Sequence, residues 1–423
     1  MSNKYVHQEI QHGKGRTVLL TLGRLPKALD LARGLSSQGA QVCVAEPHRR
    51  TLTGLSKSVS KRIVLPAPRS DPELYRRALR DALAAEQVDW VVPVSEETLH
   101  VVPTLHSDQP KAPRVFGPTP EALFTLHDKM RFIELSRSLD WPVPDTVTAD
   151  ADRATELLAT TATVLKGRWS CAGDGLEFLP PQARLPEAKR SPHWVLQAFK
   201  PGDLICSLTL SVNGTISETV AYRGRIMAGT VAVCFERIDE NEPYREFSRR
   251  VAAATNFTGF LAFDFIDDGA NPPWPIECNP RATSGLHFFN AADVAGLILT
   301  EDPEYPLRRA PHRLLQQFYA ALTETQALML RAPKQAARQV PLLWRAKDVT
   351  FQWRDPLPFW LMTYAAWPIL SRTLTTGESF GSAATWDIEW QPEDEAVVPV
   401  TTAATIVESV PSRHSSTTES ECP

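Results

Sequence analysis

Two short apolar runs separated by a polar turn constrain the fold of this chain most strongly. Residues 259–268 have the sequence GFLAFDFIDD, and residues 274–280 have the sequence WPIECNP. Aromatic and β-branched runs bounded by glycine, asparagine and proline are typical of two strands joined by a turn. We therefore predict a β-hairpin that carries Asp264 on its first strand and Glu277 and Asn279 on its second.

The polar residues of this hairpin have the chemistry of a cation site. Alternation along a strand places Glu277 and Asn279 on one face. Oxygen ligands from neighbouring strands suit a hard cation such as Mg²⁺, with Mn²⁺ as the alternative, and Mg²⁺ typically joins protein carboxylates to nucleotide phosphates. Asp264, Glu277 and Asn279 are the candidate metal ligands, and Arg281 is placed to bind a phosphoryl group bidentately. The spacing alone fits an acidic surface turn equally well.

Strand and helix patterns alternate in the first quarter of the chain. Apolar runs at 17–22, 41–45 and 89–93 are separated by helical patterns at 27–36 and 72–86. This alternation is typical of right-handed βαβ units around a parallel sheet. We therefore predict an open parallel α/β domain over residues 16–118.

The remainder has a different pattern. The segment FGPTPEAL at 116–123 is typical of a helix start, and we predict one helix from there to Leu139. Strand patterns at 161–167 and 193–199, and an Asn213-Gly214 hairpin signal, indicate antiparallel-rich α+β structure over 119–300. We predict a C-terminal helical extension over 301–390, with helices at about 312–331 and 358–374, and a disordered tail over 391–423.

Composition excludes several classes of protein. The chain has 423 residues, too many for one core, and its 43% hydrophobic and 22% charged residues are typical of globular proteins. A net charge of -4 and a pI near 6.2 create no field that favours nucleic acid or an anionic membrane surface. The six cysteines have no Cys-x-x-Cys spacing that would indicate zinc or a disulfide framework. A small-molecule substrate is the better expectation.

Two further segments bear on location. The polar N-terminus contains no apolar stretch typical of a secretory signal, so we expect a cytoplasmic protein. The apolar stretch at 356–370 contains three prolines and is shorter than the roughly 20 residues that cross a bilayer. We predict that it is buried and no membrane span, with contact to a membrane surface or a partner as the alternative.

The segments GFLAFDF and IECNPRATSG resemble the metal-binding strands of the ATP-grasp superfamily, in which an acidic strand precedes a strand with the pattern Glu-x-Asn-Pro-Arg. The resemblance covers roughly residues 16–290. It implies an ATP-grasp fold of α/β and α+β class, with a nucleotide cleft between two α+β lobes. It also implies an ATP- and Mg²⁺-dependent ligase, with Asp264, Glu277 and Asn279 on the metal and with Asn279 and Arg281 in catalytic roles.

The same resemblance assigns the nucleotide contacts. The family's lysines on the phosphates correspond to Lys129 and Lys166, and its glycine-rich flap corresponds to Ser170, Gly173 and Gly175. Its hinge strand on adenine corresponds to Gln197, Ala198 and Phe199, and its ribose-binding acid corresponds to Asp203. The segment departs from the family in its sparser flap glycines, and in having Gln197 and Ala198 where glutamate is common, so the ribose position could shift to Leu204. Taken singly, each feature also fits a solvated lysine, a plain turn or a buried strand.

Residues beyond this set are weaker candidates. Arg223 and Arg225, near Tyr222 and Glu236, lie where the acceptor or a phosphate could bind, or they form a polar strand edge. His287, in SGLHFF, is a candidate substrate contact, although a histidine beside aromatic residues is more often part of the core.

Within the superfamily the chain is most similar to the mycosporine-glycine synthase type, through TLGRLPKALDLA, IECNPRATSGLHFF, KDVTFQWRDPLPF and TWDIEW. That type implies phosphorylation of the enol oxygen of 4-deoxygadusol, followed by its replacement with the amine of glycine. The alternatives are a carboxylate-amine ligase that forms an acyl phosphate, and a non-catalytic nucleotide-binding regulatory protein. A biotin-dependent carboxylase is less expected, because no carrier-lysine segment is found. The expected partners are a small-molecule acceptor, an amino acid or amine, and a second copy in a homodimer.

Overall fold

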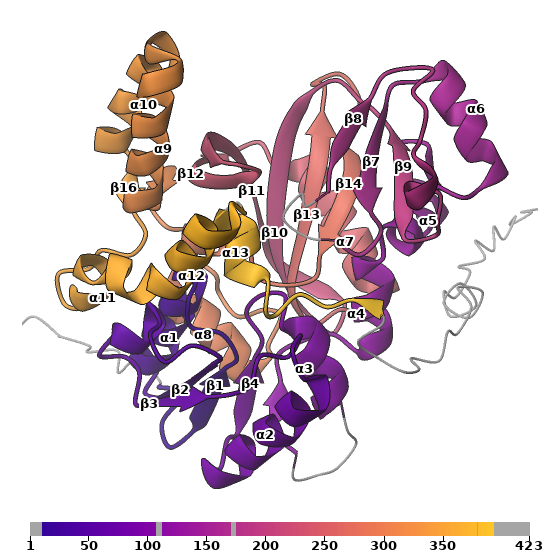
Figure 1. Cartoon of the computed structure of the whole chain (residues 1–423). Helices are drawn as coiled ribbons and strands as arrows, with labels where there is room; N and C mark the ends of the chain where they lie inside the picture. The colour runs from indigo at the N-terminus through magenta and orange to yellow at the C-terminus, as the bar shows by residue number, and fades with distance from the viewer. Residues whose placement is uncertain (1–10, 107–111, 171–174, 379, 393–423) are drawn as a thin grey trace, which may run out of the picture.

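The structure is a computed structural model that describes residues 11–106, 112–170, 175–378 and 380–392, and three β-sheets organise these residues (Figure 1). The first sheet is parallel, with the strand order β3-β2-β1-β4-β5. Its elements are β1 (Thr17–Leu20), α1 (Pro26–Ser37), β2 (Gln41–Glu46), η1 (Thr53–Leu55), β3 (Lys61–Val64), α2 (Pro72–Ala85), β4 (Trp90–Val92), α3 (Thr98–Leu105) and β5 (Arg114–Val115).

Helices cover both faces of this parallel sheet. Val18 and Leu20 of β1 face the core that contains α1, whereas Leu19 faces the core that contains α2 and α3. The predicted parallel α/β sheet is therefore confirmed. The sequence pattern misses β3, which is a largely exposed edge strand, and β5, which has two residues.

The second sheet is antiparallel, with the strand order β6-β9-β7-β8. Its elements and the helices before it are α4 (Pro120–His127), α5 (Lys129–Ser138), β6 (Thr146–Thr148), α6 (Asp152–Thr160), β7 (Thr163–Gly167), β8 (Glu177–Leu179), η2 (Glu187–Lys189) and β9 (Trp194–Ala198). The single helix predicted to Leu139 is wrong at Asp128, where the chain leaves the helical conformation (φ -71°, ψ 111°). The Asp128 carboxylate accepts the N–H groups of Met130 and Arg131 and so caps a new helix.

The third sheet has seven strands in the described residues, in the order β14-β13-β10-β11-β12-β15-β16. Its central elements are β10 (Asp203–Val212), β11 (Thr215–Ala228), β12 (Val231–Ile238), α7 (Glu242–Ala254), β13 (Gly259–Asp267), β14 (Trp274–Asn279), η3 (Ser284–Phe288) and α8 (Ala291–Thr300). Asn213 and Gly214 both have positive φ, 49° and 76°, as a type I′ turn requires. Both predicted hairpins, β10-β11 and β13-β14, are confirmed.

The C-terminal region contributes to this sheet as well as adding helices. Its elements are β15 (Leu314–Gln316), α9 (Phe318–Arg331), α10 (Pro333–Arg345), β16 (Lys347–Asp348), α11 (Leu357–Trp360), α12 (Met362–Thr376) and α13 (Phe380–Thr385). The predicted helix start near 312 is wrong, because Leu314–Gln316 pairs with β12. The unpredicted α10 packs on α9, and the two form a projecting hairpin (Figure 1). The tail predicted to be disordered lies outside the described residues from 393 onward.

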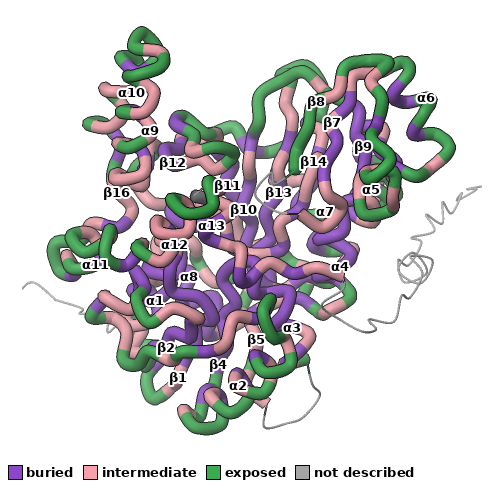
Figure 2. Tube along the Cα trace, viewed as in Figure 1, coloured by how far each residue is buried: buried purple, intermediate pink, exposed green. Residues whose placement is uncertain are grey.

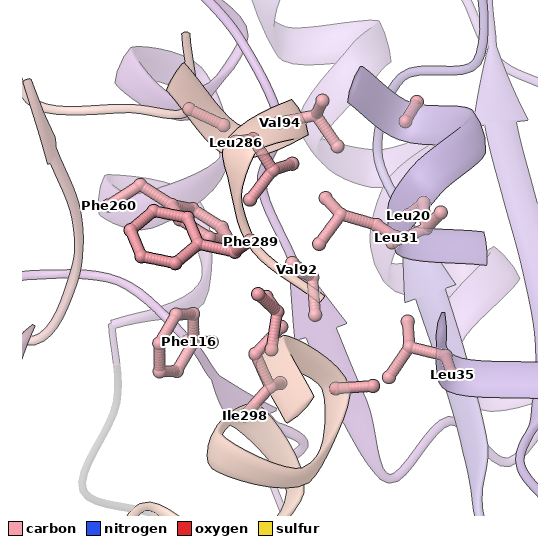
Figure 3. Packing of buried hydrophobic residues seen from close by; sticks show 14 of the residues in the cluster. Leu20, Leu31, Leu35, Val92, Val94, Phe116, Phe260, Leu286, Phe289 and Ile298 are labelled. Atoms are coloured by element: carbon pink, nitrogen blue, oxygen red, sulfur yellow. The ribbon is translucent and has the colours of Figure 1, made fainter. Parts of the chain in front are cut away.

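One hydrophobic core joins the first sheet to the third. Leu20 and Val92 of the parallel sheet face Phe260 of β13, Leu286 of η3 and Ile298 of α8 (Figure 3). Because their apolar surfaces are buried together, the two sheets share one hydrophobic core and do not form separate domains. This continuity places the carboxyl end of the parallel sheet beside the hairpin of the predicted metal ligands.

The apolar stretch at 356–370 departs from its prediction. Ala365 and Ile369 are buried, but Trp360, Tyr364 and Trp367 are exposed (Figure 2). The prediction of a buried segment is wrong for this side, because a helix that packs through one stripe leaves its opposite stripe in solvent. Among the described residues, no helix is both long enough and apolar enough to cross a membrane.

Candidate nucleotide and metal site

The hairpin β13-β14 brings the predicted metal ligands to one face. Asp264 and Glu277 lie directly opposite each other, and Asn279 pairs with Ala262 one step away. The alternate residue Cys278 packs in the core beneath α5 and α7, so the polar side chains face away from that core. Asn279 Nδ2 donates to Asp264 Oδ2 at 3.1 Å. The geometry agrees with the shared face predicted for these three residues.

A β-bulge beside the carboxylates admits Lys166. The pairing shifts after Asp264, so that Ile276 is an extra residue on β14. The carbonyl oxygen of Ile276 accepts a hydrogen bond from Lys166 Nζ at 2.8 Å, and Gln197 Oε1 accepts a second at 2.9 Å. Lys166 lies on β7 and Gln197 on β9, so this lysine links the second sheet to the face of the third sheet that carries Asp264 and Glu277.

Lys129 approaches the same carboxylates from the start of α5. Its buried Nζ donates to the carbonyl oxygen of Ser170 at 2.5 Å and lies 3.6 Å from Glu277 Oε1. The preceding Asp128 is held by Arg168 through two hydrogen bonds of 2.8 and 2.7 Å. These contacts fix the N-terminus of α5, and with it the ammonium group of Lys129, against the hairpin.

Two carboxylates and two lysines balance the formal charge of this cluster, but burial disfavours the charged forms of Asp264 and Lys166. Burial and the neighbouring charge of Glu277 raise the pKa of Asp264 to about 6, against the opposing effects of Cys206, Arg281 and Lys166. Burial also lowers the pKa of Lys166 to about 8, although Glu277 acts in the opposite direction. Carboxylates that repel each other favour an added cation, and buried lysines favour an added anion. The cluster is therefore suited to a metal-bound polyanion.

The donor set fits Mg²⁺ but does not form a cage by itself. Among the described residues, no group of three or more His, Cys, Asp or Glu side chains could hold a metal ion. Asp264 and Glu277 supply carboxylates, and Asn279 supplies an amide oxygen, all of which are hard donors. Mg²⁺ usually completes its coordination with water and substrate phosphates, so two carboxylates and an amide suffice when a nucleotide is bound.

Arg281 joins this cluster through a residue that sequence reasoning missed. Its Nη2 donates to Asn279 Oδ1 at 3.0 Å, and its guanidinium forms an ion pair with the buried Glu96. Burial raises the pKa of Glu96, but Arg281 and His127 lower it by more. Glu96 follows β4 at the carboxyl end of a parallel strand, which is where ligands bind in open α/β sheets. The position of Glu96 in the segment PVSEE, directly after a strand, is the sequence signal that could have identified this residue.

The flap predicted at SCAGDG is described only at its ends, and Gly173 lies outside the described residues. The Ser170 hydroxyl donates to Gly167 O at 3.0 Å, while its carbonyl oxygen faces Lys129. Gly175 has φ +68°, and a Cβ there would lie 3.1 Å from the Trp194 ring. The left-handed backbone and the close Trp194 ring both favour glycine at Gly175.

The predicted hinge strand lies at the edge of the same cluster. Besides its contact with Lys166, the Gln197 side chain donates to Thr146 Oγ1 at 3.1 Å. The backbone N–H of Ala198 donates to Asp145 O at 2.7 Å, and that of Phe199 donates to Ala162 O at 2.8 Å. The N–H groups of these two hinge residues are therefore already used within the protein.

Several candidates are not brought to the cluster. Asp203 is exposed at the start of β10 and shares strand parity with Ile205, which packs in the core on the far face from Asp264. Glu236 pairs with both Arg223, at 3.3 Å, and Arg225, at 2.8 Å. These arginines form a polar cluster with Glu236 across the interior strands β11 and β12, so the alternative interpretation as a polar strand edge does not describe them.

His287 is also accounted for by the protein interior. Its Nδ1 lies 2.6 Å from Asp30 Oδ2, and its ring stacks on Phe235 with centroids 5.9 Å apart. His287 is buried. A histidine with an acidic partner and an aromatic neighbour needs no ligand, so the core interpretation of His287 fits the contacts.

Solved structures that resemble the chain do so at low sequence identity. N5-carboxyaminoimidazole synthetase from Staphylococcus aureus has a TM-score of 0.58 and 14% identity, over 76% of this chain and 86% of that chain. The biotin carboxylase–β-γ-ATP complex from Campylobacter jejuni gives 0.56 and 16%, over 71% and 74%. L-amino acid ligase from Bacillus licheniformis gives 0.55 and 14%, over 69% and 78%.

These likenesses define the fold of the chain. Its shared part spans 28% of a Rhizobium etli pyruvate carboxylase chain, so such a multi-part enzyme contains much that this chain does not match. No family model matches the sequence, and no curated protein matches it significantly. The chain has the ATP-grasp fold of the predicted α/β and α+β class.

Proposed function

We propose that the protein is an ATP-dependent ligase that binds ATP together with Mg²⁺, or alternatively Mn²⁺. The observation that carries this proposal is the direct opposition of Asp264 and Glu277, with Lys129 3.6 Å from the Glu277 carboxylate. Two carboxylates paired with two buried lysines match the two charges of a metal-nucleotide complex. The pKa of Asp264 is raised and that of Lys166 is lowered, so the protein by itself stabilises these two charges incompletely, as is typical of a binding site rather than of a purely structural cluster.

Each residue has a role that follows from its position. Asp264, Glu277 and Asn279 would hold Mg²⁺, which when bound neutralises phosphate charge. Lys129 and Lys166 bind phosphate oxygens in place of their present carbonyl acceptors, Ser170 O and Ile276 O. Arg281, positioned by Glu96, contacts the transferred phosphoryl group through its guanidinium. Catalysis of this kind depends on placement and charge stabilisation and needs no covalent enzyme nucleophile.

The hinge segment binds adenine through its backbone. Because the N–H groups of Ala198 and Phe199 already donate to Asp145 O and Ala162 O, the contacts come from carbonyl oxygens or from the N–H of Lys200. The described ends of the flap, Ser170 and Gly175, border the phosphates. The ribose contact assigned to Asp203 by family resemblance is the least supported, since this residue lies on the far face of its sheet.

The reaction joins an activated carbon to an amine. The specific pair is 4-deoxygadusol and glycine, for which the support is the similarity of IECNPRATSGLHFF and TWDIEW to the mycosporine-glycine synthase type. A carboxylate-amine ligase is the second candidate, favoured by the shared fold with an L-amino acid ligase and with N5-carboxyaminoimidazole synthetase. Both reactions use the same nucleotide site and differ only in the acceptor.

A coupled assay of ADP release tests the proposal. We expect release that requires Mg²⁺ and increases at least about tenfold when the correct acceptor and amine are both present. Nucleotide binding without any turnover would instead identify a regulatory binding protein. Incubation of glycine with 4-deoxygadusol, and in parallel with a panel of carboxylic acids, separates the two ligase reactions by product mass.

A further inference from the structure

The C-terminal region carries an unusual concentration of exposed aromatic side chains. Trp344 is 86% exposed and Trp353 is 87% exposed, and every exposed tryptophan in the described residues lies between 344 and 367. We call this set the aromatic surface, and it consists of Trp344, Trp353, Trp360, Tyr364 and Trp367. Single exposed apolar residues are common, but several large ones close in sequence usually mark a contact surface.

The aromatic surface is held by packing beneath it. Trp353 contacts Phe351 edge-on with ring centroids 4.9 Å apart, and Trp360 contacts Phe359 in the same way at 5.3 Å. Phe351 and Phe359 themselves lie 5.2 Å apart. One aromatic cluster therefore supports both exposed tryptophans, so that they are presented to solvent together by α11 and the loop before it.

Helix α12 extends this surface. Tyr364, Trp367 and Leu374 recur at helical spacing and are exposed, whereas Ala365 and Ile369 are buried against the N-terminal region. The helix is apolar on both sides, and within the described residues the side of Ala365 and Ile369 is buried whereas the side of Tyr364 and Trp367 is exposed. In Figure 2 the exposed residues of α11 lie at the outer edge of the molecule.

Unbalanced positive charge accompanies the aromatic residues. Residues 326–376 contain seven Lys or Arg and two Asp, a net charge of +5 in a chain whose total is -4. Both acidic side chains are used internally, because Asp348 accepts the N–H of Thr350 at 2.8 Å and Asp355 pairs with Arg33 at 2.9 Å. Six of the cations are exposed, and no ion pair within the described residues involves them: Arg331, Lys334, Arg338, Arg345, Lys347 and Arg354.

The cations have a regular arrangement on the projecting hairpin. Lys334, Arg338 and Arg345 are spaced by four and seven residues along α10, which places them on one side of that helix. Arg50, from the N-terminal region, lies over the Tyr364 ring with its guanidinium carbon 4.6 Å from the centroid. Arg50 therefore adds positive charge directly beside Tyr364, and the three cations of α10 add it along the helix that carries Trp344.

We propose that the aromatic surface, with its surrounding cations, binds the headgroup region of a bilayer that contains anionic lipids. Tryptophan and tyrosine rings partition into this region because one edge is apolar and the other is polar, and lysine and arginine attract anionic headgroups. The protein lies on the bilayer and does not span it. This inference is independent of the proposed ligase activity.

A second copy of the chain is a poorer occupant of the surface. In a two-fold symmetric dimer the same patch meets itself, so the six exposed cations would face the same cations. Like charges at such an interface cost free energy. An anionic bilayer removes this repulsion and supplies charge complementarity.

Sedimentation of the full-length protein with lipid vesicles tests the proposal. We expect at least about tenfold stronger binding to vesicles of phosphatidylcholine with about one third phosphatidylserine than to phosphatidylcholine alone, and weaker binding at high salt, since each basic residue near an anionic surface contributes about 1 kcal/mol. Lys334→Glu with Arg338→Glu should lower binding at least about tenfold, and Trp353→Ala with Trp360→Ala should lower it comparably.

Matched controls keep the test specific. Arg184→Glu removes an exposed arginine from the opposite part of the chain, and Val64→Ala shortens an exposed apolar residue. Neither should change vesicle binding. Equal binding to neutral and anionic vesicles, no binding to either, or the same loss in Arg184→Glu would overturn the proposal. So would a dimer in light scattering that the tryptophan substitutions dissociate, since the surface would then be a homodimer interface.

Discussion

Asp264 and Asp387 are both largely removed from solvent, but the pKa of one is shifted above the ordinary value of an aspartate and the pKa of the other is shifted below it. Burial raises the pKa of Asp387, yet the adjacent His48 side chain, 3.3 Å away, and the hydrogen bonds from Arg24 lower it to about 2. Burial and Glu277 together raise the pKa of Asp264 to about 6. The same residue type therefore has opposite proton affinity in the two places, because the neighbouring charges differ.

The Asp387 cluster is complete within the protein. Arg24 donates to both carboxylate oxygens of Asp387, at 2.6 and 2.9 Å, and its Nε donates to Glu46 at 2.7 Å. Glu46 also accepts the N–H of Gly23 at 2.8 Å. These contacts tie the segment after α13 to the carboxyl end of β1 and β2.

The pKa of Asp264 shows that the charges of its cluster are less well stabilised within the protein, and this difference supports the proposed metal and nucleotide site. A buried ionic group that is fully paired inside the protein supports the fold, whereas one whose pKa is strongly raised beside a like charge is typical of a binding or catalytic site. The following predictions test this distinction, beginning with the largest expected effect.

Replacing a carboxylate of the incomplete cluster should abolish function and spare the fold. For Glu277→Gln we expect turnover to fall about 1000-fold, equivalent to about 4 kcal/mol, because the metal loses a charged ligand. ADP release measures the first effect and thermal unfolding the second. The exposed Glu240→Gln should retain full turnover, and full turnover in Glu277→Gln would reject the assigned metal site.

Replacing a carboxylate of the complete cluster should do the reverse. For Asp387→Ala we expect the free energy of unfolding to fall by about 3 kcal/mol, because Arg24 stays buried with fewer partners. The contribution of Asp387 to the free energy of unfolding is present above the ordinary pKa of an aspartate, and it is lost as the pH falls towards 2. Glu389→Ala, which breaks a more exposed pair with Arg69, should cost about 1 kcal/mol. Urea unfolding checks both, and an equal loss would contradict the distinction.

Asp264→Asn should stabilise the protein at neutral pH when no divalent cation is added. The folded-state pKa of Asp264 is raised from 3.8 to about 6, so the ionised carboxylate lowers the free energy of unfolding above pH 6. Protonation relieves this cost, and the relief is complete only below pH 3.8. At about 1.4 kcal/mol for each unit, reduced for partial exposure, the gain is about 1 to 2 kcal/mol. Urea unfolding at pH 7.5 and pH 4 checks this, and a less stable variant at pH 7.5 would contradict it.

ATP binding should depend on the protonation of Lys166. Its pKa of about 8 means that the cation is present at pH 7 and largely lost at pH 9. We expect the affinity for ATP to fall about fivefold from pH 7 to pH 9. Lys166→Met should bind ATP weakly, and its affinity should not depend on pH to a comparable extent. Titration calorimetry measures both affinities. A slope that persists in Lys166→Met would assign the titration to another group.

Local sequence pattern determined the face that the candidate metal ligands share. Alternation in GFLAFDFIDD and WPIECNP is sufficient to place Asp264, Glu277 and Asn279 on one side of a hairpin, since side-chain direction in a strand has a period of two. The Asn213-Gly214 turn and the parallel βαβ region follow from equally local signals. These are features that neighbouring residues decide.

Only the tertiary structure decided which distant residues complete the site. The pairing of Arg281 with Glu96, the approach of Lys166 to the Ile276 carbonyl and the strand at 314–316 all depend on contacts between residues far apart in sequence. The exposure of Trp360 and Trp367 likewise depends on which stripe of each helix finds a partner. No periodicity encodes such contacts, because the burial and charge of a residue are set by what packs against it.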